Sequence, residues 1–331
     1  MTISNTFQNL VDWLRGLFSE PAPRPGGATG SITPVNRKVS LIILDPIMHS
    51  EGGRRMTKVM GWNDPDRLAA DLIADLRTAS YGYANFEIVE RILVDEFPPL
   101  EDGFAYTSDE FMRCWRSRQG FHNPVWVDYH RFVRDHNIIS KVRSGAIDEV
   151  WTVGFPYAGF YESRMGGPGP FWCNAPPLEN TSEASRRFIV MAFNFERGVG
   201  EMLESHGHRA ESIMNHVYRS LTGERNLWKR FSRYDKTNPG QAEIGSVHYA
   251  PNSQTDYDWG NPTKVTCRSR AWMNFPDLSA EPAVVDCAEW GNGDIRLHHL
   301  WWFMHMPHIP GATYGISNNW WEYIIDPNKV R

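Results

Sequence analysis

Cysteine is scarce in this chain of 331 residues, and its spacing matches no disulfide or metal motif. The four cysteines are Cys114, Cys173, Cys267 and Cys287, and none of them forms a CxxC pair. This scarcity excludes a disulfide-dense scaffold and a zinc module built on cysteines. We expect free, buried thiols, although one pair could bridge if the protein is exported.

An excess of positive charge and long apolar runs are missing as well. The net charge is −5, the pI is about 6.2, and Lys and Arg form no dense cluster, which argues against a nucleic-acid partner. No apolar run reaches the ~18 residues that cross a bilayer, so we do not expect a transmembrane protein. The N-terminus lacks the basic-then-apolar pattern of a secretory signal, which predicts a cytoplasmic location and leaves export by another route open.

The motifs of several reaction classes do not occur. The chain contains no GxSxG elbow, no P-loop, no GxGxxG after a strand and no HExxH. The glycine-rich stretch "GGPGPFW" includes two prolines, which remove backbone donors that a phosphate site would use. Thiol catalysis is disfavoured because no cysteine has an evident histidine partner at the end of a predicted strand.

Tryptophan, in contrast, is abundant. The chain has 14, many of them in the second half beside Asn, Asp and His. Indole rings flanked by polar groups suit a sugar-binding cleft, because a pyranose ring stacks on an aromatic plane. The alternative is a core rich in tryptophan, and both interpretations stay open. The hydrophobic fraction of 41% and the charged fraction of 22% are ordinary for a folded protein.

The first 37 residues differ from the rest. Residues 1–19 contain "TFQNLVDWLRGLF", whose apolar residues recur at helical spacing and predict an amphipathic helix. Residues 20–37 are rich in Pro and Gly and predict a linker. We expect the helix to dock to protein, either its own domain, a sister subunit or a larger assembly. A membrane-surface role is the weakest option because few basic residues are present.

Residues 38–331 predict a single α/β domain with a mostly parallel sheet and crossover helices. Its sheet-and-helix part, 38–225, alternates apolar strand patterns with amphipathic helix patterns, as parallel sheets require. Its loop-rich part, 226–331, carries long polar stretches and two short strand patterns, at 242–251 and 283–291. A (β/α) barrel is the alternative. The main strand patterns are at 38–46, 85–97, 147–156 and 186–195, with helices predicted at 66–80 and after residue 195.

Ligands of such sheets bind beyond the carboxyl ends of the strands. Polar, acidic and aromatic residues recur where these strands end, and they predict a pocket for a small-molecule or glycan substrate. The candidate substrate-binding residues are Asp45, Tyr157, Glu162, Asn194, Arg197, His206, His248, Asn252, Trp259, Trp290 and Trp320. His206 also fits a core histidine, because it lies on the apolar stripe of its predicted helix.

Glycoside hydrolysis uses two carboxylates on either side of one bond. Glu196 and Glu289 each end an apolar strand pattern beside an aromatic residue, so they are the predicted catalytic pair, with Asp45 and Glu162 as substitutes. The leading prediction is therefore a hydrolase acting on a carbohydrate or glycoconjugate, with no cofactor.

A metal-dependent hydrolase with a His/Asp/Glu cluster is the second prediction. Its candidate ligands for a divalent metal are His208, Glu211, Asp258 and His298, although no spacing in the chain specifies a metal. The glutamates of the predicted helix, such as Glu204 and Glu211, equally fit a solvated face with Arg209 as their partner. A non-catalytic carbohydrate- or protein-binding module has the same composition and is the third alternative.

Overall fold

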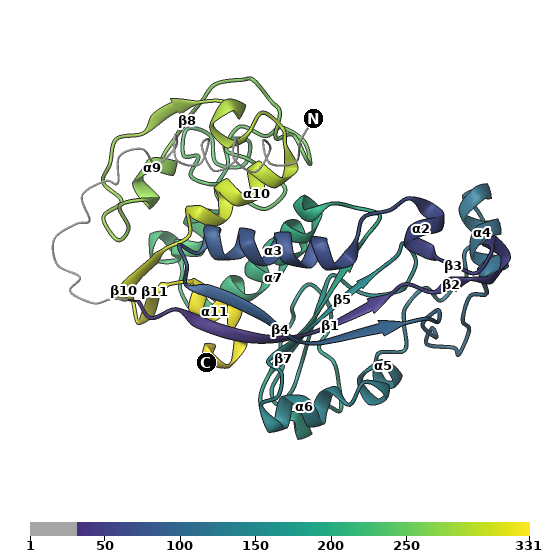
Figure 1. Cartoon of the computed structure of the whole chain (residues 1–331). Helices are drawn as coiled ribbons and strands as arrows, with labels where there is room; N and C mark the ends of the chain where they lie inside the picture. Colours follow the sequence, from purple (N-terminus) through teal and green to yellow (C-terminus); the bar gives the residue numbers. More distant parts are fainter. Residues whose placement is uncertain (1–31) are drawn as a thin grey trace. The chain divides into compact units, whose positions relative to one another are not determined.

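The computed structural model describes residues 32–331, which form two compact units (Figure 1). The first, here called the sheet unit, comprises Pro34–Thr78, Gly82–Ile213 and Tyr323–Arg331. The second, the loop-rich unit, comprises Ala79–Tyr81 and Met214–Glu322, together with the described residues before Pro34. The predicted domain thus divides into two units. The predicted helix 1–19 and most of the linker 20–37 lie outside the described residues.

The sheet unit is built on a mixed sheet of five mostly parallel strands, which confirms the predicted α/β class. The order is β4-β1-β5-β7-β6, and only the β6–β7 pair is antiparallel. The outer strands β4 and β6 do not pair with each other, so within residues 32–331 the sheet is open and no barrel forms. The strands are β1 (Val35–Leu44), β4 (Ala84–Val94), β5 (Glu149–Gly154), β6 (Ser163–Gly166) and β7 (Phe188–Asn194).

The buried strands follow from apolar runs in the sequence. The last six residues of β1 are all buried, as expected for a central parallel strand that is covered on both faces. β1 begins at Val35, before the predicted domain boundary at 38. The edge strand β6 was not predicted, because the four residues "SRMG" are too short and too polar to show an apolar alternation. A two-stranded hairpin, β2 (Ile47–Met48) with β3 (Arg54–Arg55), follows β1.

Helices cover both faces of this sheet. In Figure 1, α3 and α7 run along one face, while α5 and α6 lie on the other. Leu68, Leu72 and Leu76 of α3 are buried, and their spacing of four residues explains the predicted helix. A capping box of Thr107 and Glu110 begins α4. The helices are α2 (Met56–Met60), α3 (Pro65–Ala79), α4 (Ser108–Ser117), α5 (Tyr129–Asp135), α6 (Ile138–Ser144) and α7 (Val199–Val217).

The loop-rich unit has short elements around an aromatic core. Trp320 is fully buried against Trp228, Phe231 and Trp272, and its Nε1 donates a hydrogen bond to the hydroxyl of Tyr218 (3.1 Å). The elements are α8 (Leu227–Phe231), β8 (Val265–Cys267), α9 (Ser269–Trp272), β9 (Ala283–Val285), α10 (Ile295–Met304), β10 (His308–Thr313) and β11 (Ile316–Asn319). The last helix, α11 (Trp321–Ile325), begins in this unit and ends in the sheet unit.

Two strand predictions in this unit need correction. The stretch 242–251 forms only an isolated bridge between Ala242 and Cys267, because its chain turns back on itself through Gly245, which has a φ of +88°. The stretch 283–291 is a strand only over Ala283–Val285, after which a 3-10 turn begins at Cys287. Alternating apolar residues here mark positions in an irregular core.

Two further expectations concern the state of the cysteines and helices that could cross a membrane. All four cysteines are free and buried. Among residues 32–331, no helix is both long enough and apolar enough to cross a membrane.

Candidate functional site

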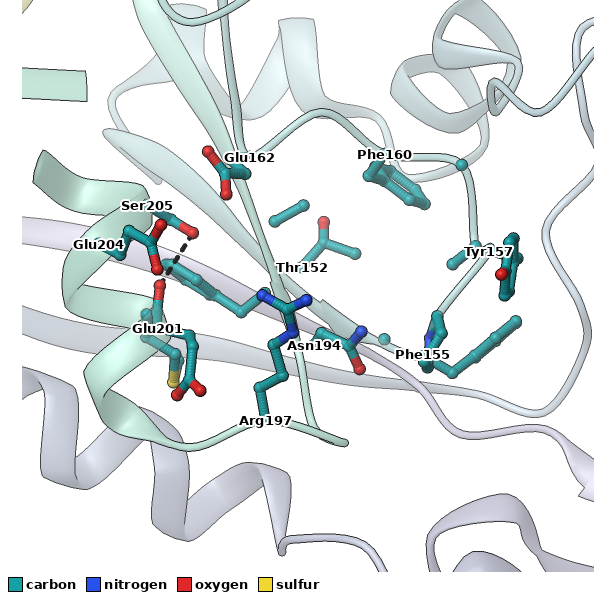
Figure 2. A pocket seen from close by; sticks show the side chains of 17 residues that line it. Thr152, Phe155, Tyr157, Phe160, Glu162, Asn194, Arg197, Glu201, Glu204 and Ser205 are labelled. Carbon is teal, nitrogen blue, oxygen red and sulfur yellow. Dashed lines mark hydrogen bonds between the residues drawn. The ribbon is translucent and has the colours of Figure 1, made fainter. Parts of the chain in front are cut away.

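A cavity of about 290 Å³ opens in the sheet unit at the carboxyl ends of β5 and β7. Thr152 and Gly154 come from β5, and Asn194 ends β7. One wall is the segment 155–162, and the opposite wall is the first turns of α7 with Arg197 before them. Figure 2 shows aromatic side chains gathered on one side and carboxylates on the other. A cavity thus lies beyond the ends of two parallel strands, where ligands of such sheets commonly bind.

The aromatic wall is held by a close backbone contact. A Cβ on Gly159 would lie 2.4 Å from the carbonyl oxygen of Val125, so only glycine fits, and its φ of +85° also favours glycine. The amide of Val127 donates to the carbonyl oxygen of Gly159 (2.9 Å). Tyr157, two residues earlier, has a left-handed φ of 69°, an uncommon conformation for a tyrosine. Such backbone conformations occur often at functional sites.

The opposite wall begins where β7 turns into α7. The side chain of Asn194 accepts a hydrogen bond from the amide of Glu196 (3.0 Å). The Glu201 carboxylate accepts one from the amide of Gly198 (3.0 Å), which satisfies a backbone donor at the start of the helix. Arg197 lines the cavity as well. Glu201, which is also among the residues that line the cavity, is therefore a capping residue.

A histidine surrounded by carboxylates lies beside the cavity, on α7. His208 Nε2 is 3.8 Å from a Glu162 oxygen and 3.9 Å from a Glu204 oxygen. On the other side of the ring, His208 Nδ1 is 3.4 Å from Glu211 Oε2. Asn174 holds Glu162 in place by donating a hydrogen bond of 2.6 Å to its carboxylate. We call Glu162, Glu204, His208 and Glu211 the α7 cluster.

The neighbouring carboxylates affect the pKa of His208. Burial alone lowers the pKa of His208, but the hydrogen bond to Glu211 and the charges of Glu162, Glu211 and Glu204 outweigh it and raise the pKa above its ordinary value. The site thus carries excess negative charge that favours a cation.

The hydroxyl of Thr152 is a polar group of the cavity that protein contacts leave unsatisfied. Its side chain lines the cavity and is almost fully buried, yet its hydroxyl oxygen has no hydrogen-bond partner in the protein. A buried hydroxyl without a partner costs about 1–3 kcal/mol. A polar group bound in the cavity would remove that cost.

Neither member of the predicted catalytic pair is among the residues that line this cavity. Glu196 is exposed beside Arg197 (3.9 Å) and does not line the cavity. Glu289 lies in the loop-rich unit, on the turn Cys287–Trp290, 3.9 Å from Arg270. Burial raises the pKa of Glu289, and Asp286 adds to this while Arg270 opposes it. Because the two carboxylates belong to different units, their pairing stays a prediction.

Four of the predicted substrate-binding residues line the cavity, namely Tyr157, Glu162, Asn194 and Arg197. Asp45 has a structural role instead, because its buried carboxylate accepts hydrogen bonds from the amide and the hydroxyl of Thr57 (2.9 and 2.7 Å).

His206 is a core residue. It stacks on Phe193 (ring centroids 5.6 Å apart), and burial, with a smaller contribution from the Arg209 charge, holds its pKa well below the ordinary value.

The other predicted substrate-binding residues belong to the loop-rich unit. His248 pairs with Asp256 (3.1 Å), and Asn252 is buried and donates to the carbonyl oxygens of Asn261 and Thr263. Trp259, Trp290 and Trp320 are buried, so their rings contact protein side chains. A platform for a sugar must face solvent, so these tryptophans favour the core interpretation.

Of the predicted metal ligands, the structure brings two together. His208 and Glu211 are neighbours in the α7 cluster. Asp258 accepts hydrogen bonds from Gln254 and Asn261 within its own loop.

His298 is fully buried and stacked on Trp259, and burial, with the nearby charges of His299 and His248, holds its pKa well below the ordinary value.

Sequence reasoning missed Thr152 and assigned Glu204 to a solvated face. The spacing of four residues between Glu204 and His208 was the available signal, because it places both on one side of a helix. The expected partner, Arg209, instead forms a fully buried pair with Glu149 (2.9 Å), whereas Glu204 is among the residues that line the cavity. In comparisons with protein-family models, curated proteins and solved structures, nothing matched the chain.

Proposed function

We propose that this protein is a metal-dependent hydrolase whose active site is the cavity of the sheet unit. Glu204 and His208 from α7, with Glu162 from the facing segment, would hold a divalent cation. One observation carries the proposal: His208 Nε2 lies 3.8 and 3.9 Å from carboxylate oxygens of two different elements.

These distances are too long for hydrogen bonds. Metal bonds of about 2.0–2.2 Å place neighbouring ligand atoms roughly 3 to 4 Å apart, so each of these two distances suits a pair of ligands on one ion.

The second nitrogen of His208 supports this interpretation. Histidine ligands usually donate their other ring N–H to a carboxylate, which fixes the tautomer and orients the ring. Glu211 lies at hydrogen-bond distance from Nδ1, so Nε2 faces Glu162 and Glu204. A mixed set of imidazole and carboxylate ligands suits Zn²⁺ or Mn²⁺.

Groups of the cavity would then bind and orient the substrate. A divalent cation supplies a Lewis acid and makes bound water more acidic. The Arg197 guanidinium offers positive charge to an oxygen that becomes negative during hydrolysis. The Asn194 amide and the Thr152 hydroxyl offer hydrogen bonds from the ends of β7 and β5.

Calorimetric titration of the EDTA-treated full chain with Zn²⁺ and Mn²⁺ tests the proposal. We expect one cation per chain, and at least 100-fold weaker binding after His208→Ala or Glu204→Gln. Glu211→Gln, which removes only the orienting contact, should weaken binding by about 10- to 100-fold. Glu196→Gln, an exposed carboxylate just before α7, is the matched control and should bind like wild type.

Hydrolysis is assayed with nitrophenyl esters, phosphates and glycosides, before and after EDTA. Restoration of activity by the added cation is expected. A wild-type chain that binds neither cation, or a His208→Ala variant that binds like wild type, would overturn the proposal.

A metal-free glycosidase is the second candidate, and a specific geometry favours it. Glu162 and Glu204 both lie within 4 Å of one His208 nitrogen, so their nearest oxygens are at most about 8 Å apart, compatible with glycosidase carboxylate pairs. In this case Glu162, one of the two predicted substitutes, and Glu204 replace the pair Glu196 and Glu289. Glycoside hydrolysis that persists in EDTA and is lost in both Glu162→Gln and Glu204→Gln would favour this candidate.

A further inference from the structure

Two polar side chains that line the cavity, Thr152 and Arg197, have hydrogen-bond donors that no described residue accepts. The Thr152 side chain is only 1% exposed, and its hydroxyl has no partner. The Arg197 guanidinium lies 3.9 Å from a Glu196 oxygen, too far for a hydrogen bond, and it donates none within residues 32–331. Figure 2 shows the Arg197 side chain extending among the residues of the lining. Both donors are therefore available to a ligand.

Other arginines of the sheet unit are committed to acceptors of the protein. Arg164 of β6 donates to the carbonyl oxygens of Pro176 and Pro177 (2.9 and 3.4 Å). Arg209 of α7 donates to the Glu149 carboxylate. Neither of these arginines lines the cavity. Among the described residues of the lining, Arg197 is the only cationic side chain.

The carboxylates of the lining leave this positive charge free for an anion. Glu162 and Glu204 hold the divalent cation in the proposed site, and Glu201 accepts a hydrogen bond from the Gly198 amide (3.0 Å). The two charges of the cation and the one of Arg197 together balance these three carboxylates. A guanidinium then binds a carboxylate or phosphoryl group through two parallel charge-assisted hydrogen bonds. The Thr152 hydroxyl offers one more donor.

The other side of the same cavity is apolar. Phe155, Tyr157 and Phe160 line it, and Figure 2 shows these rings on the side away from Glu201 and Glu204. Tyr157 is fixed by stacking on Phe121, with centroids 3.5 Å apart. Binding cavities commonly combine such apolar walls with a few polar groups that orient the ligand. The lining thus accepts a molecule that has both an apolar part and a charged part.

We infer that the substrate is an organic anion, whose carboxylate or phosphoryl group binds Arg197 and Thr152 and whose apolar part contacts the aromatic wall. The inference rests on the proposed function for the cation that balances the charge of the cavity. A permanent anion interacts with Arg197 before any reaction, so this contact increases the affinity for the substrate itself.

Calorimetric titration of the cation-loaded full chain tests the inference. Phenylphosphonate and phenylacetate carry the two anionic groups without a hydrolysable bond, 2-phenylethanol is their neutral match, and inorganic phosphate lacks the ring. We expect at least one of the two phenyl anions to bind at least tenfold more tightly than 2-phenylethanol, and phenylphosphonate to bind more tightly than inorganic phosphate. The tighter phenyl anion identifies the group as carboxylate or phosphoryl.

Variants assign that binding to the two donors. Arg197→Gln should weaken binding of the tighter phenyl anion by about 10- to 100-fold, and Arg197→Lys, which keeps the charge, should recover part of the loss. Thr152→Val should weaken it by about fivefold and leave the urea midpoint unchanged, because the hydroxyl has no partner in the protein. Arg143→Gln, at an exposed arginine of α6, is the matched control and should bind like wild type.

Arg197→Gln should leave divalent-cation binding unchanged, which separates this inference from the proposed function. Anion binding that depends on Arg197 in a chain that takes up no cation would contradict only the metal proposal. In a chain that does bind a cation, three results would overturn the inference: binding of 2-phenylethanol as tight as that of both phenyl anions, anion affinity that survives Arg197→Gln, or equal affinity for inorganic phosphate and phenylphosphonate.

Discussion

Tryptophan differs in exposure between the two units of this protein. In the sheet unit Trp126 and Trp172 are exposed while Trp151 is fully buried, whereas every tryptophan among the described residues of the loop-rich unit is buried. The difference follows from how each unit makes its core. A sheet covered by helices takes much of its apolar surface from Val, Ile and Leu, so it does not need every aromatic side chain in its core. A unit with few regular elements fills its interior with large rings that stack on one another.

In the sheet unit, we expect the largest loss of stability when the buried ion pair between Arg209 and Glu149 is broken. Both side chains are fully buried, and Arg209 also donates to the carbonyl oxygen of Ile324 (2.9 Å). Arg209→Met leaves an unpaired buried carboxylate, so we expect the free energy of unfolding to fall by about 5 kcal/mol. The measurement is urea unfolding followed by circular dichroism. The double variant Arg209→Met/Glu149→Gln should recover part of the loss, and a loss below about 1 kcal/mol for the single variant would contradict the role of the pair.

Trp320→Ala tests the aromatic core of the loop-rich unit. It removes the ring that packs on Trp228, Phe231 and Trp272, and we expect a loss of about 4 kcal/mol in the free energy of unfolding. Trp172→Ala is the matched control, since an exposed indole should contribute only about 0.5 kcal/mol. Equal losses in both variants would remove the distinction between the two classes of tryptophan.

Lowering the pH should change the contribution of one carboxylate in each unit to the free energy of unfolding, with opposite sign in the two units. In the sheet unit, Asp148 is partly buried, which raises its pKa, but the Lys38 amide, Arg37 and Arg186 outweigh burial and hold the pKa below 3.8. Its stabilising contribution is present above the unfolded pKa of about 3.8 and is lost as the pH falls through the lower folded pKa. Asp148→Asn should therefore reduce stability at pH 7 and flatten the acid-induced loss below pH 4.

Glu289 of the loop-rich unit behaves in the other direction. Its pKa is raised above 4.5, so ionisation near pH 7 destabilises the folded state and protonation at lower pH removes the penalty. Glu289→Gln should stabilise the protein slightly at pH 7 and have no effect near pH 4. Urea midpoints at pH 7, 4 and 3 measure both variants, and parallel pH profiles of the two would contradict the assignment.

The smallest effect concerns the thiols. Each unit holds two buried cysteines, and burial raises the pKa of Cys173 to about 11. We expect no thiol to react with Ellman's reagent in the native protein, and reducing agents to leave the melting temperature unchanged. Thiol labelling is then repeated at increasing urea concentrations, and the labelled peptides are identified by mass. Labelling of Cys173 reports unfolding of the sheet unit, and labelling of Cys287 reports unfolding of the loop-rich unit. Rapid labelling of Cys173 in the native state would contradict its burial.

Prediction from the sequence succeeded where local pattern and tertiary burial agree. The apolar run of β1 and the leucine stripe of α3 specify their elements locally, and parallel order then places Tyr157, Glu162 and Asn194 at one edge of the sheet. Prediction was weaker for Glu204, whose interpretation depended on the partner of Arg209. The stretch 242–251 looked like a strand because an irregular aromatic core also needs apolar residues at alternate positions.

Periodicity and chain order are sufficient to predict the α/β class, the mostly parallel sheet and the edge at which polar side chains gather. Which ionisable groups face the cavity depends on contacts that form only when the chain folds. Glu149 and Arg209, like Glu162 and His208, come from segments tens of residues apart, and no local pattern encodes such contacts. Burial of an indole likewise depends on neighbours from the whole unit, so tryptophans alike in sequence differ in exposure in the fold.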